Sequence, residues 1–307
     1  MGLSEKSRAW VFLDEIQAYP DCVPALKFLH DHFDVKFVVT GSSSFYLKNL
    51  FSESLAGRKI LFELFPLNYQ EFLLFKGVKK TSSTTFAGKE KAKNELFWER
   101  EKSLFEEYLQ FGGFPQVVLA DDLFLKKEYL KDIFKSYYEK DVQVMAGFRN
   151  LTAFRDLLLL LTQRIGSKLD ATKLSSELGI TRDTVYSYLS FLEATYVVFF
   201  LPAFSRNPDR EVSGAKKVYL CDPGLARFLG NNSEGNLFEN AVFLQLPKDE
   251  KVAFFQKRNG GEIDFLLPHK KIALEVKQTA NVRDLQKLSV MAQDLGMREQ
   301  YVITRQF

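Results

Sequence analysis

Residues 10–15 read Trp-Val-Phe-Leu-Asp-Glu, four apolar residues followed by two carboxylates. A short apolar run that ends in polar residues is typical of a buried strand. Helical spacing of apolar residues follows as far as His30, and a second run, rich in β-branched residues, spans 36–40. Two strand-helix units in succession predict a parallel sheet covered by helices, with a third strand at residues 60–64.

The composition of the 307 residues limits the classes of protein to which the chain can belong. A hydrophobic fraction of 46% and an aromatic fraction of 14% exclude a disordered chain, and the length predicts two or three domains. The net charge of +3 permits contact with nucleic acid but falls short of a histone-like surface. Cys22 and Cys221 stand in no metal-ligand spacing, which favours a reducing cytoplasm, and no apolar run approaches the ~20 residues of a membrane span.

The middle of the chain is predicted to be helical and to end in a helix-turn-helix. After a polar connection at 76–94, helical periodicity spans 96–109, 123–145 and 154–164. A helix at 171–178, a turn at Gly179 and a helix at 181–193 follow, and the hydroxyl of Thr181 is in position to cap the second helix. Two strands, at 196–201 and 217–220, complete the outline of a winged helix.

The residues after 236 form a separate α/β pattern. One helix is followed by strands at 252–256, 262–267 and 272–277, then by a helix at 282–295 and a last strand at 301–304. The chain is therefore predicted to end in an α/β domain of its own.

The acidic pair at the end of the first strand has the form of a Walker B strand. In such a strand Asp14 would hold Mg²⁺ through water, and Glu15 would orient the attacking water. The alternative is that both carboxylates only favour the positive end of the following helix. Thr40 and Ser42 end the second strand, where P-loop ATPases place a polar sensor residue, and this context favours the first interpretation.

Several ordered motifs resemble a predicted archaeal and bacterial ATPase family of the AAA superfamily. The resemblance covers nearly the whole chain and rests on L-D-E-I-Q (13–17), V-T-G-S-S-S (39–44), L-A-G-R (55–58), F-P-L-N-Y-Q-E-F (65–72), G-G-F-P (112–115), G-N-L-F-E-N (235–240), G-E-I-D-F (261–265) and L-E-V-K (274–277). It implies ATP and Mg as cofactors. It also implies that Asp14 and Glu15 are the Walker B pair, that Thr40 or Ser42 is the sensor, and that Arg58 lies near the γ-phosphate.

One motif of that family is missing. A P-loop, G-x-x-x-x-G-K-[ST], should precede the acidic strand, but Gly-Lys occurs here only at Gly88-Lys89, where Glu90 follows. Without that loop the backbone amides and the lysine that hold the phosphates are absent, and the sheet loses its central strand. We therefore expect a shortened form of a longer ATPase with impaired ATP function. A pseudo-ATPase, or one completed by another polypeptide, is the alternative.

Near the carboxyl end, a four-residue loop at 268–271 fixes the register of two predicted strands. This register places Asp264 opposite Glu275 and Glu262 opposite Lys277, with Glu275 and Lys277 on one face. Like charges directly opposite one another are destabilising, so the arrangement predicts a divalent cation, Mg or Mn, between Asp264 and Glu275. It matches the D-(x)n-E-x-K pattern of restriction-endonuclease-like folds, in which Glu239 would be a further metal ligand and Lys277 catalytic.

Two other interpretations of this region remain open. The hairpin can be amphipathic with a charged face toward solvent, and a nuclease-like fold can serve as an inactive binding platform. The presumed recognition helix carries Arg182 and Asp183 on a nearly neutral face, so protein packing and DNA binding are equally favoured. Cations of the wing could add contacts to phosphate: Arg206, Arg210, Lys216 and Lys217.

The sequence as a whole predicts an α/β chain of four parts. Residues 1–75 are the remnant of an AAA-type ATPase core with a partial parallel sheet, and residues 76–150 are a helical lid. Residues 151–212 are a winged helix, and residues 213–307 are a restriction-endonuclease-like α/β domain. The predicted function is that of an AAA-superfamily ATPase acting on DNA, with a protein partner or a homo-oligomer as further options. The alternatives are a metal-dependent DNA nuclease and a non-enzymatic nucleic-acid or protein-binding module.

Overall fold

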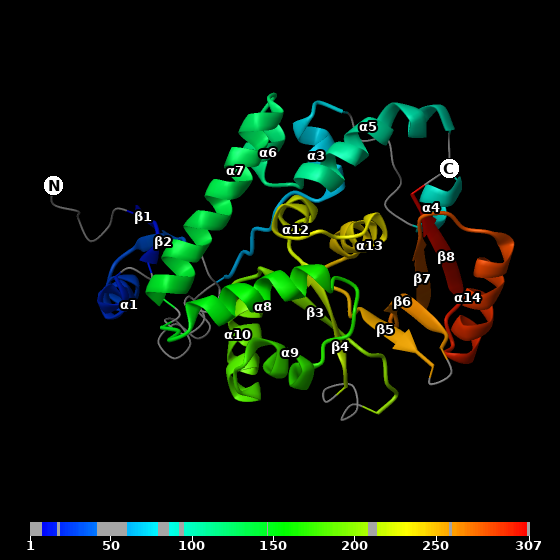
Figure 1. The fold of residues 1–307 in the computed structure, drawn as a ribbon. Helices are drawn as coiled ribbons and strands as arrows, with labels where there is room; N and C mark the ends of the chain where they lie inside the picture. Colours follow the sequence, from blue (N-terminus) through cyan, green and yellow to red (C-terminus); the bar gives the residue numbers. More distant parts are fainter. Residues whose placement is uncertain are drawn as a thin grey trace.

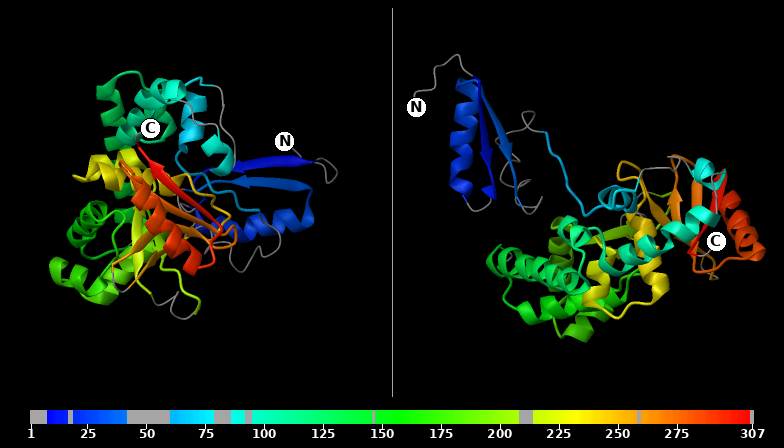
Figure 2. Two further views of the ribbon diagram at one scale, coloured as in Figure 1. Left: turned by 90° about the vertical axis from the view of Figure 1, so that its right-hand side faces the viewer. Right: turned by 90° about the horizontal axis from the view of Figure 1, so that it is seen from above.

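The computed structural model describes residues 8–16, 19–41, 60–78, 86–91, 95–145, 147–207, 214–257 and 260–305. Its elements are mixed α and β, with helices and small sheets. A small unit of two strands and a helix projects from one side of the molecule, whereas the helical middle and the carboxyl-terminal sheet lie together (Figures 1 and 2). Within these residues, no helix combines the length and the apolar character needed to cross a membrane.

The projecting unit contains the parallel strand pair that the sequence predicts. β1 (Ala9–Leu13) pairs with β2 (Val35–Val39), and the chain between them forms η2 (Pro20–Cys22) and α1 (Val23–His32). One face of the pair packs on a small apolar cluster around Val23 and Leu26. The other face exposes Trp10 by 60% and Phe12 by 72%. Parallel sheets are normally covered on both faces, so this pair has an unusually open side.

The third strand expected at residues 60–64 is not formed. The backbone there is irregular, and Ile60, Phe62 and Leu64 are 82%, 83% and 96% exposed. An apolar run becomes a strand only where a neighbouring strand accepts its hydrogen bonds, and none lies beside it within the described residues. The segment instead leads to α3 (Tyr69–Phe75), which begins with a capping box formed by Asn68 and Glu71.

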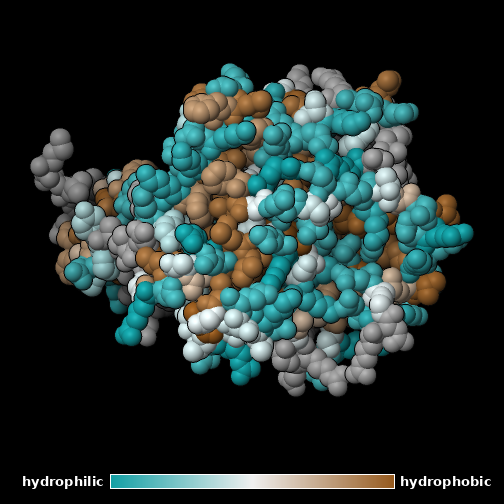
Figure 3. Space-filling model, in the orientation of Figure 1, coloured by the Kyte–Doolittle hydropathy of each residue, from teal (hydrophilic) through white to brown (hydrophobic). Residues whose placement is uncertain are grey.

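The helical middle region forms as predicted, with some additional helices. Its elements are α4 (Phe86–Lys91), α5 (Glu95–Phe111), α6 (Pro115–Leu119), α7 (Leu123–Ser136), the π-helical η3 (Tyr137–Met145) and α8 (Leu151–Gln163). Figure 3 shows hydrophilic side chains over much of this face, with hydrophobic ones in a band through its middle and at its upper edge, over α6 and α7. Leu119, Leu123 and Phe124 are exposed there.

The helix-turn-helix and its hairpin lie where the sequence places them. α9 (Ala171–Leu178) ends at Gly179 in the left-handed conformation, and α10 (Arg182–Ala194) begins after Thr181. The Thr181 hydroxyl accepts the amide of Thr184 at 3.2 Å, which confirms the predicted cap. β3 (Val198–Pro202) and β4 (Lys216–Leu220) then pair antiparallel. The two strands of this hairpin lie on opposite sides of residue 212, where the sequence analysis placed the boundary between the winged helix and the last domain.

The carboxyl-terminal part is a four-stranded sheet with the predicted register. Its elements are α12 (Pro223–Leu229), α13 (Glu234–Leu244), β5 (Ala253–Gln256), β6 (Glu262–Leu267), β7 (Ile272–Lys277), α14 (Val282–Asp294) and β8 (Glu299–Thr304). The strand order is β5-β6-β7-β8, and β6 pairs with β7 from Phe265 opposite Leu274 to Leu267 opposite Ile272, which is the predicted register. The largest apolar cluster joins α8–α10, the hairpin, α13 and this sheet, so these elements share one core.

Candidate functional site

The acidic end of β1 and the end of β2 meet at one edge of the parallel pair. The Thr40 hydroxyl donates a hydrogen bond to Asp14 Oδ1, and the backbone amide of Thr40 donates to the carbonyl of Leu13 at 2.8 Å. Because the strands are parallel and in register, their carboxyl ends lie side by side. The structure thus brings together two residues that are 26 positions apart in the sequence.

Glu15 adopts a backbone conformation that is uncommon for a residue with a side chain. Its φ is +52°, and its amide donates to the Thr40 hydroxyl at 3.3 Å. Strained conformations of this kind cluster at binding and catalytic sites, because surrounding contacts must hold them in place. Asp14, Glu15 and Thr40 are all exposed. Ser42 and Arg58, the other residues expected here, lie outside the described residues.

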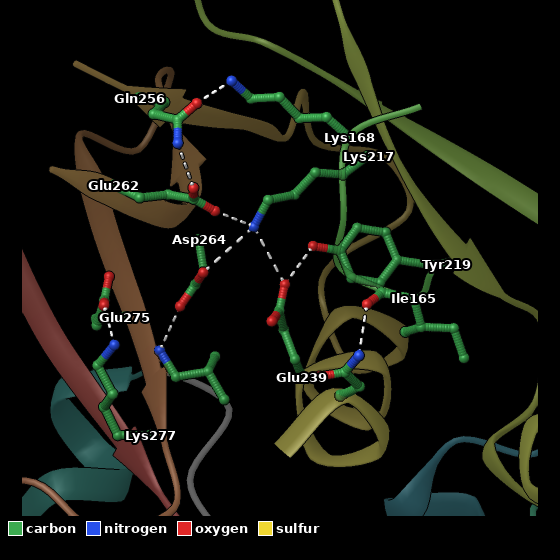
Figure 4. A network of polar contacts seen from close by, with 12 residues as sticks. Ile165, Lys168, Lys217, Tyr219, Glu239, Gln256, Glu262, Asp264, Glu275 and Lys277 are labelled. Atoms are coloured by element: carbon green, nitrogen blue, oxygen red, sulfur yellow. Dashed lines mark hydrogen bonds and ion pairs between the residues drawn. The ribbon is translucent and has the colours of Figure 1, made fainter. Parts of the chain in front are cut away.

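A second group of charged residues surrounds Lys217 on β4. Its ammonium lies 3.3 Å from Glu239 Oε1 and 3.4 Å from Asp264 Oδ1, and it also pairs with Glu262 (Figure 4). Lys217 is only 2% exposed. The expectation that Lys217 contacts phosphate from the wing is therefore wrong, because its side chain points into the protein. Burial lowers the pKa of Lys217, but attraction from these carboxylates outweighs that effect and raises the pKa overall.

Glu239 projects from α13 into this group and is held there by two hydrogen-bond donors. Its Oε1 accepts the hydroxyl of Tyr219 at 2.7 Å as well as the Lys217 ammonium. Gly166 leaves room for the carboxylate, since a Cβ at that glycine would lie 2.8 Å from Oε1. Burial and repulsion from Asp264 raise the pKa of Glu239 despite the lysine beside it.

The predicted trio of Asp264, Glu275 and Lys277 does not share one contact in the structure. Asp264 Oδ2 accepts the amide of Val276 at 2.8 Å and its Oδ1 faces Lys217, whereas Glu275 Oε1 pairs with Lys277 at 2.7 Å (Figure 4). Burial, and then repulsion from Asp264, raise the pKa of Glu275 to about 7. The two acids therefore interact through charge and not through a common partner.

From the sequence, Lys217 was placed among the cations of the wing, and its central position in this group was missed. Lys217 and Tyr219 alternate with Val218 and Leu220 on β4, so one face of a largely apolar strand carries an ammonium and a phenol. This alternation was the sequence signal that Lys217 and Tyr219 share one face of the strand. Only the folded chain shows that this face turns toward Glu239. Within the described residues, no group of three or more His, Cys, Asp or Glu side chains is arranged to hold a metal ion.

Three family models match successive regions of the chain. Residues 2–73 match the AAA domain, residues 102–235 match a domain of unknown function (DUF8612), and residues 234–306 match a domain of unknown function (DUF4143). No solved structure matches the chain at a significant level.

Three similar proteins are themselves uncharacterized. A protein of Methanocaldococcus jannaschii is 30% identical over 97% of this chain and 68% of its own length. A protein of Haemophilus influenzae is 25% identical over 92% of this chain and 70% of its own length. A protein of Mycobacterium tuberculosis is 23% identical over 88% of this chain and 59% of its own length.

The identity to the archaeal relative extends through the AAA domain and through both regions that follow it. The acidic strand, the parallel pair and the carboxyl-terminal sheet thus fall within regions that the family models match. The chain accordingly belongs to the family of that archaeal protein, an AAA-like ATPase family with an AAA domain at its amino end and a DUF4143 domain at its carboxyl end.

Proposed function

We propose that the chain provides the acidic-strand half of a Mg²⁺–ATP site and works as an AAA-type ATPase module. The observation that carries the proposal is the contact between Asp14 and Thr40 across the ends of β1 and β2. Open α/β sheets bind nucleotides at the carboxyl ends of their parallel strands, and this contact lies at such an edge.

The side chains at this edge suit the proposed cofactor. Mg²⁺ prefers carboxylate, hydroxyl and water oxygens, and Asp14, Glu15 and Thr40 offer only oxygens toward solvent. In the proposed site Asp14 holds the ion through water, Glu15 orients the attacking water, and Thr40 or Ser42 contacts the γ-phosphate, with Arg58 nearby. Bound Mg²⁺ would neutralise charge on the phosphates.

The phosphate-binding half of such a site has no match in the 307 residues, because the P-loop pattern does not occur among them. Backbone amides and the lysine of that loop supply most of the phosphate contacts in P-loop proteins. The proposal therefore assigns these residues a weak affinity for Mg²⁺–ATP, with a dissociation constant on the order of 0.1–1 mM.

The finer description of the remaining units is also part of the proposal. The order of α9, turn, α10 and hairpin supports a winged helix, and the sheet with its E-x-K strand supports a restriction-endonuclease-like fold. The burial of Lys217 removes one of the wing cations from any phosphate contact. We therefore assign the winged helix to packing against protein and not to recognition of DNA.

Calorimetric titration with ATP, with and without Mg²⁺, tests the proposal. Wild-type chain should bind Mg²⁺–ATP weakly, Asp14→Ala should not bind, and Glu15→Gln should bind without turnover. Asp34→Ala is the matched control, because Asp34 is an exposed carboxylate that precedes β2 at its opposite end and should leave binding unchanged. Binding that is equal in wild type and Asp14→Ala, or that does not need Mg²⁺, would contradict the proposal.

A further inference from the structure

The ammonium of Lys217 lies between Glu239 and Asp264, two of the three acids that were expected to hold a divalent cation. Three carboxylates surround it: Glu239 from α13 at 3.3 Å, Asp264 from β6 at 3.4 Å, and Glu262 from the same strand. A divalent cation would draw the same oxygens to within about 2.0–2.6 Å of one centre. An ammonium and a metal ion cannot share that centre, so the two are alternatives.

The remaining contacts of these carboxylates fit a lysine better than a metal. Glu239 Oε1 already accepts the Tyr219 hydroxyl, and Asp264 Oδ2 already accepts the amide of Val276. Glu275, which a metal would need as a ligand, is paired with Lys277 at 2.7 Å. A Mg²⁺ or Mn²⁺ ion would have to displace Lys217 and break several of these hydrogen bonds. The residues present therefore do not fit a resident metal.

The position of Lys217 is built into the fold. The residues that follow it on β4, Val218 to Leu220, are buried, its side chain is 3% exposed, and its ammonium lies 5.5 Å from the centre of the Phe254 ring. Because β4 is paired with β3 along its whole length, the strand cannot turn this face to solvent without opening the hairpin. The ammonium thus links the hairpin to α13 and to β6.

We propose that Lys217 is the resident cation of this centre: its ammonium takes the place of a divalent metal ion, partly offsets the charge of Glu239, Glu262 and Asp264, and fastens the hairpin to the carboxyl-terminal sheet. The unit then performs no metal-dependent cleavage, and its carboxylates have a structural role. Removing the ammonium while keeping the carboxylates should convert the centre into a metal site, because an uncompensated acidic cluster attracts a divalent cation.

Titration with Mn²⁺ alone, followed by the electron paramagnetic resonance signal of free Mn²⁺, tests the proposal. Wild type should bind none at this centre up to about 1 mM, whereas Lys217→Met should bind one ion per chain with a dissociation constant on the order of 10–100 µM. The double variant Lys217→Met/Asp264→Asn should lose that binding. Lys216→Met is the matched control, since Lys216 is the exposed neighbour on the same strand and should behave as wild type.

Thermal unfolding gives a second, independent measurement. Lys217→Met should lower Tm by roughly 5–10 °C, and millimolar Mn²⁺ should restore most of that loss while leaving the wild-type Tm unchanged. If Lys217→Met does not fold, Lys217→Gln, which keeps a polar group at the same position, takes its place.

Three results would overturn the proposal. The first is Mn²⁺ binding by the wild type that Asp264→Asn abolishes. The second is folded Lys217→Met or Lys217→Gln chain that takes up no Mn²⁺. The third is Mn²⁺-dependent nicking of supercoiled DNA by the wild type that disappears in Lys277→Ala. None of these measurements involves ATP, so their outcome is separate from that of the proposed ATPase function.

Discussion

Asp222 is a fully buried carboxylate whose hydrogen-bond donors are backbone amides. It accepts the amide of Gly113 at 2.6 Å and that of Leu225 at 2.8 Å, and burial raises its pKa to about 6. The two glycines of the G-G-F-P motif make this approach possible. A Cβ at Gly112 would lie 1.9 Å from Asp222 Oδ1, and a Cβ at Gly113 would lie 2.0 Å from the carbonyl oxygen of Leu67. The motif therefore provides a close approach between segments as well as a helix stop.

The first prediction compares two glycines with similar backbone conformations. Gly112 has φ +77° and meets Asp222, whereas Gly179 has φ +64° and has open space where its Cβ would be. Gly179→Ala should therefore lower the free energy of unfolding by about 1 kcal/mol, which is the backbone effect alone. Gly112→Ala should lower it by about 3 kcal/mol or more, because the clash adds to that effect. Urea denaturation of both variants measures the difference. An equal decrease in the free energy of unfolding would contradict the prediction, because it would mean that Asp222 moves away from the new methyl group at no cost.

The second prediction concerns the dependence of stability on pH. The folded-state pKa values of Asp222 and Glu275 are raised from 3.8 and 4.5 to about 6 and about 7. At a pH between its unfolded-state and its folded-state pKa, each carboxyl group stays protonated in the folded protein but is ionised in the unfolded chain. These two groups therefore lower the free energy of unfolding as pH rises from about 4 to 7.

The variant Glu275→Gln isolates one of these contributions. It should reduce the loss of stability between pH 5 and pH 8 by about 1–2 kcal/mol, after allowance for partial solvent screening. Urea denaturation at both pH values provides the measurement. Glu128→Gln, a change at an exposed carboxylate on α7, serves as the control and should leave the pH dependence unaltered. A Glu275→Gln profile parallel to the wild type would show that Glu275 is not stabilised in its protonated form.

At the scale of single elements, α10 shows how one hydroxyl fixes where a helix begins. Thr181 accepts the amide of Thr184 and has the extended backbone of an N-cap residue. Thr181→Ala should lower the free energy of unfolding by about 1 kcal/mol, whereas Thr181→Ser, which keeps the hydroxyl, should cost much less. Chemical denaturation tests the pair, and equal losses in both variants would mean that the methyl group and not the cap is what matters.

Most elements could be predicted because their signals are local. Apolar periodicity and turn residues placed α8–α10 and the four strands of the last sheet, and the loop at 268–271 set the β6–β7 register. The helix α12 was missed although Asp222 and Pro223 are an N-cap and first-turn pair, since it is only seven residues long. The segment 60–64 was wrongly predicted as a strand because its composition says nothing about whether a partner strand is present.

At the same scale, the charged group around Lys217 divides into what could and could not be predicted. Alternation along β7 placed Glu275 and Lys277 together, and their ion pair follows from that spacing. The burial of Lys217 depends on packing of β4 against α13 and β6. Its partners there, Glu239 and Asp264, lie 22 and 47 positions after it in the sequence. No local pattern carries that information, so the sequence suggested a metal where the fold places an ammonium.

For the molecule as a whole, the fourth prediction is that stability is uneven. Among the described residues, the β1–β2 unit rests on a cluster of three buried ones, Ile16, Val23 and Leu26, whereas the main cluster spans the helices and the hairpin and reaches the last sheet. Backbone amides of β1 and β2 should therefore exchange with solvent on the order of 100-fold faster than those of β6 and β7. Hydrogen exchange by mass spectrometry measures this, with amides in exposed loops as the fast reference. Equal protection in both sheets would contradict it.

The contact between Asp222 and Gly113 also sets the order of events during synthesis. The turn after α5 leaves the ribosome 109 residues before the carboxylate that holds it. At about 5–20 residues per second, the turn waits roughly 5–20 seconds for Asp222 to be made. During that interval the nascent helices α5–α7 lack the hydrogen bond from Gly113 to Asp222. A chaperone that binds apolar helices would have its longest time to bind them in this interval.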